Sequence, residues 1–174
     1  MKAERTTKEE MDLSFELPET GSYAWQIDGA GIKKFADQSG DKEKDSIMIP
    51  MKPVVVIKGS QDSIGRGASL FVRYNKPFGE KMLNTLLTIT GLIDEFIAKF
   101  GGEFDPGTDK FIGGLQVKLA GKVIGADHEV VKQKTGKNEG KDAVQFTKIY
   151  RYKPGGTTTS ATTEGATTTE EAGW

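Results

Sequence analysis

Cysteine is absent from this chain of 174 residues, and His128 is its only histidine. The absence of cysteine excludes a disulfide framework, a thiolate nucleophile and the His/Cys spacings of zinc sites. His128 lies between Asp127 and Glu129, and we expect it to be an ordinary surface residue. Because no set of nucleophile, base and orienting group is evident, we expect a protein that is not an enzyme and that needs no metal and no cofactor.

Long apolar runs are missing as well. No stretch approaches the roughly 18 residues of a membrane span, and no basic segment followed by an apolar one opens the chain. The glycine-containing run "GSQDSIGRG" lacks the Lys-Ser/Thr ending of a phosphate-binding loop. A cytosolic protein without membrane contact is therefore expected.

Apolar residues are scarce at both ends of the chain. Residues 155–174 contain eight threonines, three glutamates and no basic residue, so they cannot offset the entropy of ordering. Residues 1–20 carry three basic and six acidic side chains. We expect a polar extension over residues 1–20, one folded domain over 21–153 and a disordered acidic tail over 154–174.

Positive charge is concentrated between these ends. There the chain has 21 basic and 16 acidic residues, and residues 111–153, with nine basic and four acidic, account for the whole excess. A basic body between acidic ends is typical of a protein that binds a polyanion. An unevenly charged, solvated surface explains the same feature equally well.

Alternating apolar and polar residues predict three strands in the first half of the domain, over residues 21–35, 46–59 and 68–75. Gly29 and Gly31 indicate a bulge or sharp bend, and the prolines of the second strand, Pro50 and Pro53, indicate an edge or irregular stretch. Tyr23 and Trp25 share a face with Ile27, so we expect them in the core.

The period then changes. Between residues 82 and 100 the apolar residues recur at steps of three and four, which predicts a helix. It should begin near Pro77, be divided at Gly91 and end at Gly101. A glycine-rich connector and strands over 115–134 and 143–153 follow, with a basic loop between the two strands.

This order of elements predicts the fold class. Three strands, a helical segment and two further strands are the arrangement of the OB-fold, a mainly β, partly open five-stranded barrel with its helix between strands 3 and 4. Residues 115–134 could instead form two strands, and a generic α+β sheet is the alternative fold.

OB-folds bind oligonucleotides on strands two and three and on the adjoining loops. Single-strand binding needs cations for the phosphates and aromatic rings for the bases. The candidate DNA-binding residues are Lys52, Lys58, Arg66, Phe71 and Arg73 in and around strands two and three, Lys132, Lys134, Lys137 and Lys141 around the last loop, and Lys148, Tyr150, Arg151 and Tyr152 in the last strand.

Some of these aromatic residues have a second interpretation. Phe71 could belong to the core, because both faces of its strand carry apolar residues. Tyr150 and Tyr152 could cap the barrel instead of stacking on bases.

The runs "GSYAWQIDGAGIK", "GLQVKLAGKVI" and "VQFTKIYRYKP", followed by a polar linker and an acidic tip that ends in an aromatic residue, resemble the single-stranded DNA-binding proteins of bacteria and bacteriophages, the phage members above all. The resemblance is one of layout, over about residues 21–154. It implies sequence-independent protection of single-stranded DNA in phage replication or recombination, and, if a phage encodes the chain, a place in the cytoplasm of the host bacterium.

The resemblance also implies that the tail recruits replication or recombination proteins, through Glu170, Glu171 and Trp174. Bacterial tips carry aspartates, a proline and a final phenylalanine, whereas this chain ends in "EEAGW", so a phage-encoded partner fits at least as well as a cellular one. We also expect the acidic tip to fold back on the domain's lysines when DNA is absent, since 20 flexible residues reach about 25 Å.

Two other functions compete with DNA binding. The chief alternative is a non-enzymatic phage structural or protein-interaction β-domain with basic loops. A regulatory mimic of nucleic acid is a weaker alternative, because the body is positively charged. The sequence leaves open whether the chain forms a homo-oligomer and whether it prefers DNA or RNA.

Overall fold

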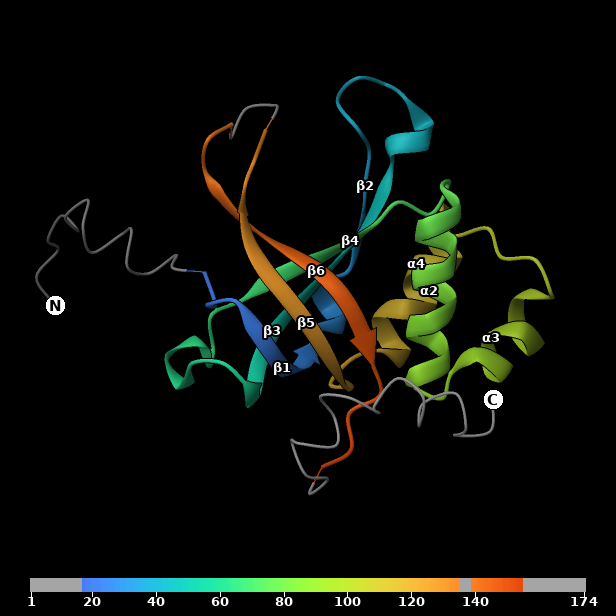
Figure 1. Ribbon diagram of the computed structural model, residues 1–174. Helices are drawn as coiled ribbons and strands as arrows, with labels where there is room; N and C mark the ends of the chain where they lie inside the picture. Colours follow the sequence, from blue (N-terminus) through green and yellow to red (C-terminus); the bar gives the residue numbers. More distant parts are fainter. Residues whose placement is uncertain (1–16, 135–138, 155–174) are drawn as a thin grey trace, which may run out of the picture.

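Six antiparallel strands form one sheet in this computed structural model, which describes residues 17–134 and 139–154 (Figure 1). The strands are β1 (Gly21–Ile27), β2 (Lys33–Phe35), β3 (Ser46–Lys58), β4 (Ala68–Val72), β5 (Val123–Lys132) and β6 (Asp142–Tyr150). Three helices lie between β4 and β5, namely α2 (Pro77–Ile89), α3 (Ile93–Phe100) and α4 (Asp109–Lys118). The mainly β class is confirmed.

The long strand β3 organises the sheet. The strand order is β2-β3-β1-β5-β6, and β4 pairs with β3 as well. Residues 47–51 of β3 pair with β4, and residues 51–58 pair with β1. Within the described residues no ladder joins β4 to β6, so the sheet is open.

The two prolines lie inside β3, and the strand continues through both. A proline cannot donate a backbone hydrogen bond, but its carbonyl can still accept one. The Pro50 carbonyl accepts from the backbone N–H of Asp28 (2.9 Å), and the Pro53 carbonyl accepts from that of Gly65 (3.0 Å). The irregularity expected here takes the form of a register shift against β1, next to the pair of Trp25 and Pro53.

The expected first strand is divided in two. A 3-10 turn at Gly29–Gly31 separates β1 from β2, where the sequence predicts a bulge or bend. A β-carbon at Gly29 would lie 2.7 Å from the Cα of Ala120, so only glycine allows the chain after α4 to approach this turn so closely. The glycines therefore mark the point at which the chain leaves β1.

Helices α2 and α3 agree with the sequence. Pro77 is the first residue of α2, and Gly91, with φ of +75°, separates the two helices. Gly101, with φ of +84°, caps the end of α3. Positive φ values favour glycine, which explains why the helices end at these residues.

Helix α4 is not expected from the sequence, which predicts a connector and then a strand from residue 115. The Thr108 hydroxyl caps the helix by accepting from the Phe111 N–H (3.3 Å), and Phe111 and Leu115 are fully buried on its inner side. The rings of Phe100 and Phe111 also pack together, with centroids 5.1 Å apart. Packing against α3 thus overrides the low helix propensity of the two glycines in α4, and β5 begins only at Val123.

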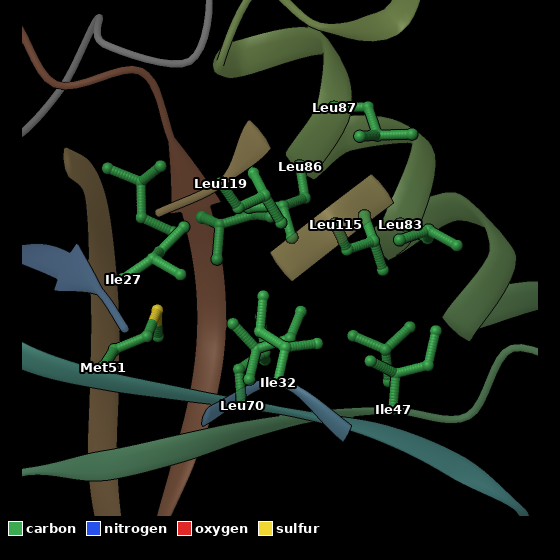
Figure 2. Close-up of a cluster of buried hydrophobic side chains, with 14 of the residues drawn as sticks. Ile27, Ile32, Ile47, Met51, Leu70, Leu83, Leu86, Leu87, Leu115 and Leu119 are labelled. Atoms are coloured by element: carbon green, nitrogen blue, oxygen red, sulfur yellow. The ribbon is translucent and has the colours of Figure 1, made fainter. Parts of the chain in front are cut away.

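The core lies between the inner face of the sheet and the helices. Figure 2 shows the side chains of Ile27, Ile32, Ile47, Met51 and Leu70 opposite those of Leu83, Leu86, Leu87, Leu115 and Leu119. Tyr23 and Trp25 are fully buried, which confirms their expected place in the core. Of the helices in residues 17–134 and 139–154, none is long and apolar enough to cross a membrane.

His128 is buried, so its expected place on the surface is wrong. Strand alternation turns it inward between its two acidic neighbours, and its ring lies 5.3 Å from that of Trp25 and 5.5 Å from that of Tyr23. Its Nε2 lies 3.1 Å from the carbonyl of Pro18. Burial lowers the pKa of His128 below its usual value, although the Pro18 carbonyl opposes that shift.

Candidate nucleic-acid interface

The outward side of β2, β3 and β4 carries an exposed aromatic pair. Phe35 on β2 and Phe71 on β4 are 45% and 54% exposed, and their rings meet edge to face with centroids 6.1 Å apart. Both strands pair with β3, whose Met48 is the register partner of Lys33 on one side and of Phe71 on the other. The two phenylalanines are therefore neighbours although 36 positions separate them in the sequence.

Three exposed cations lie on the same side of these strands. Lys33, Lys52 and Arg73 are exposed. Two-residue alternation places Lys33 on the side of Phe35, Arg73 on that of Phe71 and Lys52 on that of Met48. We call these six residues the outer aromatic face: Lys33, Phe35, Met48, Lys52, Phe71 and Arg73. Aromatic rings and cations on one surface can stack on bases and contact phosphates.

The loop between β2 and β3 adds negative charge beside this face. Hydrogen bonds from the hydroxyl of Ser39 and, less strongly, from its backbone N–H (3.0 Å) hold the pKa of the Asp37 carboxyl below its usual range, and the charges of Lys44 and Arg73 contribute less. An ion pair from Lys76 to Glu43 (2.9 Å) connects the loop to the segment after β4. Asp37 therefore stays ionised near Arg73, where it would compete with a phosphate.

The β5–β6 hairpin carries the expected cluster of lysines. Lys132 forms an exposed ion pair with Asp142 (2.9 Å), and Lys134 and Lys141 are exposed. Lys137 lies outside the described residues. In Figure 1 this hairpin and the β2–β3 loop both project towards the top of the view.

The last strand contains a β-bulge that the sequence does not reveal. Asp127 pairs with Lys148 and His128 with Phe146, so Thr147 is the extra residue. Phe146 consequently turns inward against Trp25, with ring centroids 4.9 Å apart, whereas Lys148 lies on the outward side. Regular two-residue alternation along residues 143–153 would place Phe146 and Lys148 on one face, and the bulge places them on opposite faces instead.

Tyr150 is buried against the outward side of β5, which favours its second interpretation as a capping residue over a role in base stacking. It is 4% exposed, and its hydroxyl donates to the Asp127 carboxylate (3.1 Å). Its ring covers Gly125, where a β-carbon would clash with it. Burial, followed by the charge of Asp127, raises the pKa of Tyr150 well above its usual value. The ammonium of Lys148 lies over the ring of Tyr150, 5.8 Å from its centroid.

The remaining candidates do not join the outer aromatic face. Arg151 donates from Nη2 to the Thr88 carbonyl at the end of α2 (3.4 Å), and Tyr152 is half-buried. Lys58 is exposed, but it lies six residues beyond Lys52 along β3, or about 20 Å at 3.3 Å per residue. Arg66, in the turn after β3, donates from Nη1 to the Leu17 carbonyl (3.5 Å). The tail residues Glu170, Glu171 and Trp174 lie outside the described residues.

Sequence reasoning missed Lys33, Phe35 and Met48. The signal for the first two was the run "KKF" directly after the glycine bend, where a lysine and a phenylalanine two positions apart share one side of a strand. The proximity of Phe35 to Phe71 depends on the pairing of β2 with β3, which no local sequence pattern encodes. Three of the predicted residues, Lys52, Phe71 and Arg73, are brought together with them.

In comparisons with known proteins, no family model and no curated protein sequence matches the chain.

Proposed function

We propose that this protein binds single-stranded nucleic acid, without sequence preference and without catalysis, on the outer aromatic face. The observation that carries the proposal is the exposed pair of Phe35 and Phe71, with Lys33, Lys52 and Arg73 exposed on the same side of the strands. A pair of exposed rings on a sheet gains little from its own fold, but it offers apolar faces to unstacked bases.

The strand connections support an OB-type barrel as the scaffold. If β1 and β2 are two halves of one bent first strand, that strand pairs with the second (β3) and the fourth (β5), and β5 pairs with the fifth (β6). The helices lie between the third strand (β4) and the fourth. In this assignment the β2–β3 loop and the β5–β6 hairpin are the two loops that flank the ligand in OB-folds.

A fluorescein-labelled oligo-dT and a duplex of equal length test the proposal by fluorescence anisotropy across a salt series. The label is the better reporter because Trp25 is fully buried. We expect preference for the single strand and a log-log slope of about −0.7 for each phosphate contacted. Equal affinity for the duplex, or a flat salt response, would refute the proposal.

A protein-interaction domain is the second candidate, favoured by the same exposed rings, since an apolar pair can also be covered by another protein. A role in phage replication or recombination would follow from single-strand binding, the first candidate. If oligo-dT fails to bind at low salt, sedimentation of the wild-type chain beside its Phe71→Ser variant shows whether the rings cover a second copy.

The acidic tail extends the proposal. Its three glutamates and absence of basic residues would let it compete with DNA for the domain's cations, and Trp174 would anchor a replication or recombination partner. Deletion of residues 155–174 should tighten oligo-dT binding at low salt, with a smaller gain at high salt because the attraction is screened. Unchanged affinity at low salt would exclude the competition.

A further inference from the structure

A cleft of about 480 Å³ lies between α2, α3 and the segment that leads from α3 to α4. These elements are beside one another at the right of the molecule in Figure 1. Apolar side chains from all three contribute to its walls, including Leu83 of α2, Ile93 and Ile97 of α3, and Phe104. Ile97 is 44% exposed, although its side chain is fully apolar.

The charged groups of the cleft have one sign. Glu80, Glu103 and Asp105 belong to its lining, and no lysine or arginine does so among the residues that the structure describes. None of the three carboxylates forms an ion pair with another described residue. An apolar wall beside unpaired carboxylates is complementary to an apolar side chain flanked by cations.

We propose that this cleft binds a short basic segment of a partner protein, with one apolar side chain against Ile97 and Phe104 and its lysines or arginines against the carboxylates. The chain's own ends fit poorly. Residues 1–8 are basic, with Lys2, Arg5 and Lys8 against Glu4, but Met1 and Ala3 are their only apolar residues and five acidic residues follow over 9–20. Residues 155–174 carry three acidic and no basic side chains. Nucleic acid is excluded by the same carboxylates, because they repel phosphates.

Three synthetic peptides test the inference on the full chain by NMR chemical-shift mapping: a basic apolar one (KRLFRK), one without the apolar pair (KRSSRK) and one of opposite charge (EDLFED), each with blocked ends. We expect saturable shifts for the first alone, centred on backbone amides around residues 80–106. No nucleic acid is present, so the result does not depend on the proposed function.

Matched variants locate the binding. Glu103→Lys with Asp105→Lys changes the cleft, whereas Asp62→Lys with Glu129→Lys makes the same change of charge at exposed sites outside it. Ile97→Ser alters the apolar wall, and Val117→Ser, at a residue 73% exposed on α4, is its control. We expect the cleft variants to weaken binding about tenfold and the controls to change it less than about twofold.

Three outcomes would overturn the inference. The first is the absence of saturable binding of KRLFRK. The second is an equal response to KRSSRK, which would mean that charge alone attracts the peptide. The third is equal weakening by the cleft variants and their controls, which would mean that the peptide contacts the acidic surface at large. A cleft variant that fails to fold is recognised by loss of dispersed amide signals, and the remaining cleft variant then decides.

Discussion

The ring of Phe71 on β4 is 54% exposed, whereas the ring of Tyr150 on β6 is 4% exposed, although both side chains leave the outward side of the same sheet. Their cross-strand neighbours differ. Phe71 pairs with Met48 and, beyond it, with Lys33. Tyr150 pairs with Gly125 and, beyond it, with Ala24.

The size of these neighbours explains the difference. A ring can lie flat on a sheet only where the side chains beneath it are small. Gly125 and Ala24 leave that space, and Tyr150 fills it, while its hydroxyl reaches Asp127. Met48 and Lys33 occupy the corresponding space beside Phe71, whose ring therefore stands in solvent and meets Phe35. An aromatic residue on an outward strand position thus contributes to stability or remains exposed for a ligand, according to residues far away in the sequence.

The largest expected effect is on stability. Tyr150→Ala should lower the free energy of unfolding by about 3–5 kcal/mol, because it removes a buried ring. Phe71→Ala should change it by no more than about 0.5 kcal/mol. Urea titration followed by circular dichroism measures both. Similar losses in the two variants would show that exposure does not separate these residues.

The second prediction concerns the space beneath the ring. Gly125→Ala should cost about 1–3 kcal/mol, since the new methyl group would meet the ring of Tyr150. The cost should nearly vanish when Tyr150→Ala is also present, which a double-mutant cycle measures. Gly113→Ala on α4, with no atom near its added β-carbon, is the control and should stabilise by about 0.5–1 kcal/mol. Additive losses in the cycle would contradict this account.

The third prediction concerns affinity. Phe35→Ala and Phe71→Ala should each weaken oligo-dT binding by about 1–3 kcal/mol, the range measured for a stacked base, and leave the thermal midpoint unchanged. Phe78→Ala provides the control, because Phe78 is 71% exposed but lies on α2 and not on the sheet. Anisotropy titrations at one fixed salt concentration compare the three. Equal losses would mean that any exposed ring suffices.

The smallest expected effect is a pH dependence from the inner face. The folded-state pKa of His128 lies below its unfolded value of about 6.5, so the unfolded chain binds this proton more readily. The free energy of unfolding should therefore be unaffected by His128 above about pH 7 and should fall as the pH drops below about 6.5 towards the folded-state pKa.

His128→Gln should remove this slope between pH 7 and 5.5, where no other histidine titrates. Urea titrations at several pH values measure the slope in the wild-type chain and in the variant. A persistent slope in the variant would assign it to other groups.

Part of the fold and of the candidate face could be predicted locally. Strand and helix periods identified the core positions of β1, β3 and β4, since the side that is buried repeats every two or about 3.6 residues. Pro77, Gly91 and Gly101 identified the ends of α2 and α3. Helix α4 was missed because its glycines weaken the helical pattern that Phe111 and Leu115 maintain. The pattern of cations and rings on short strands was enough to predict three candidates for this face, Lys52, Phe71 and Arg73.

The sequence by itself determined the alternation that places Trp25 in the core and Phe71 on the opposite face of its strand from Leu70 and Val72, and the charge contrast between the basic body and its acidic ends. Only the tertiary structure decided that Phe71 is exposed and Tyr150 covered, that a bulge at Thr147 separates Phe146 from Lys148, and that His128 lies in the core. The physical reason is that alternation is a property of one strand, whereas exposure depends on the neighbours that strand pairing brings from distant segments.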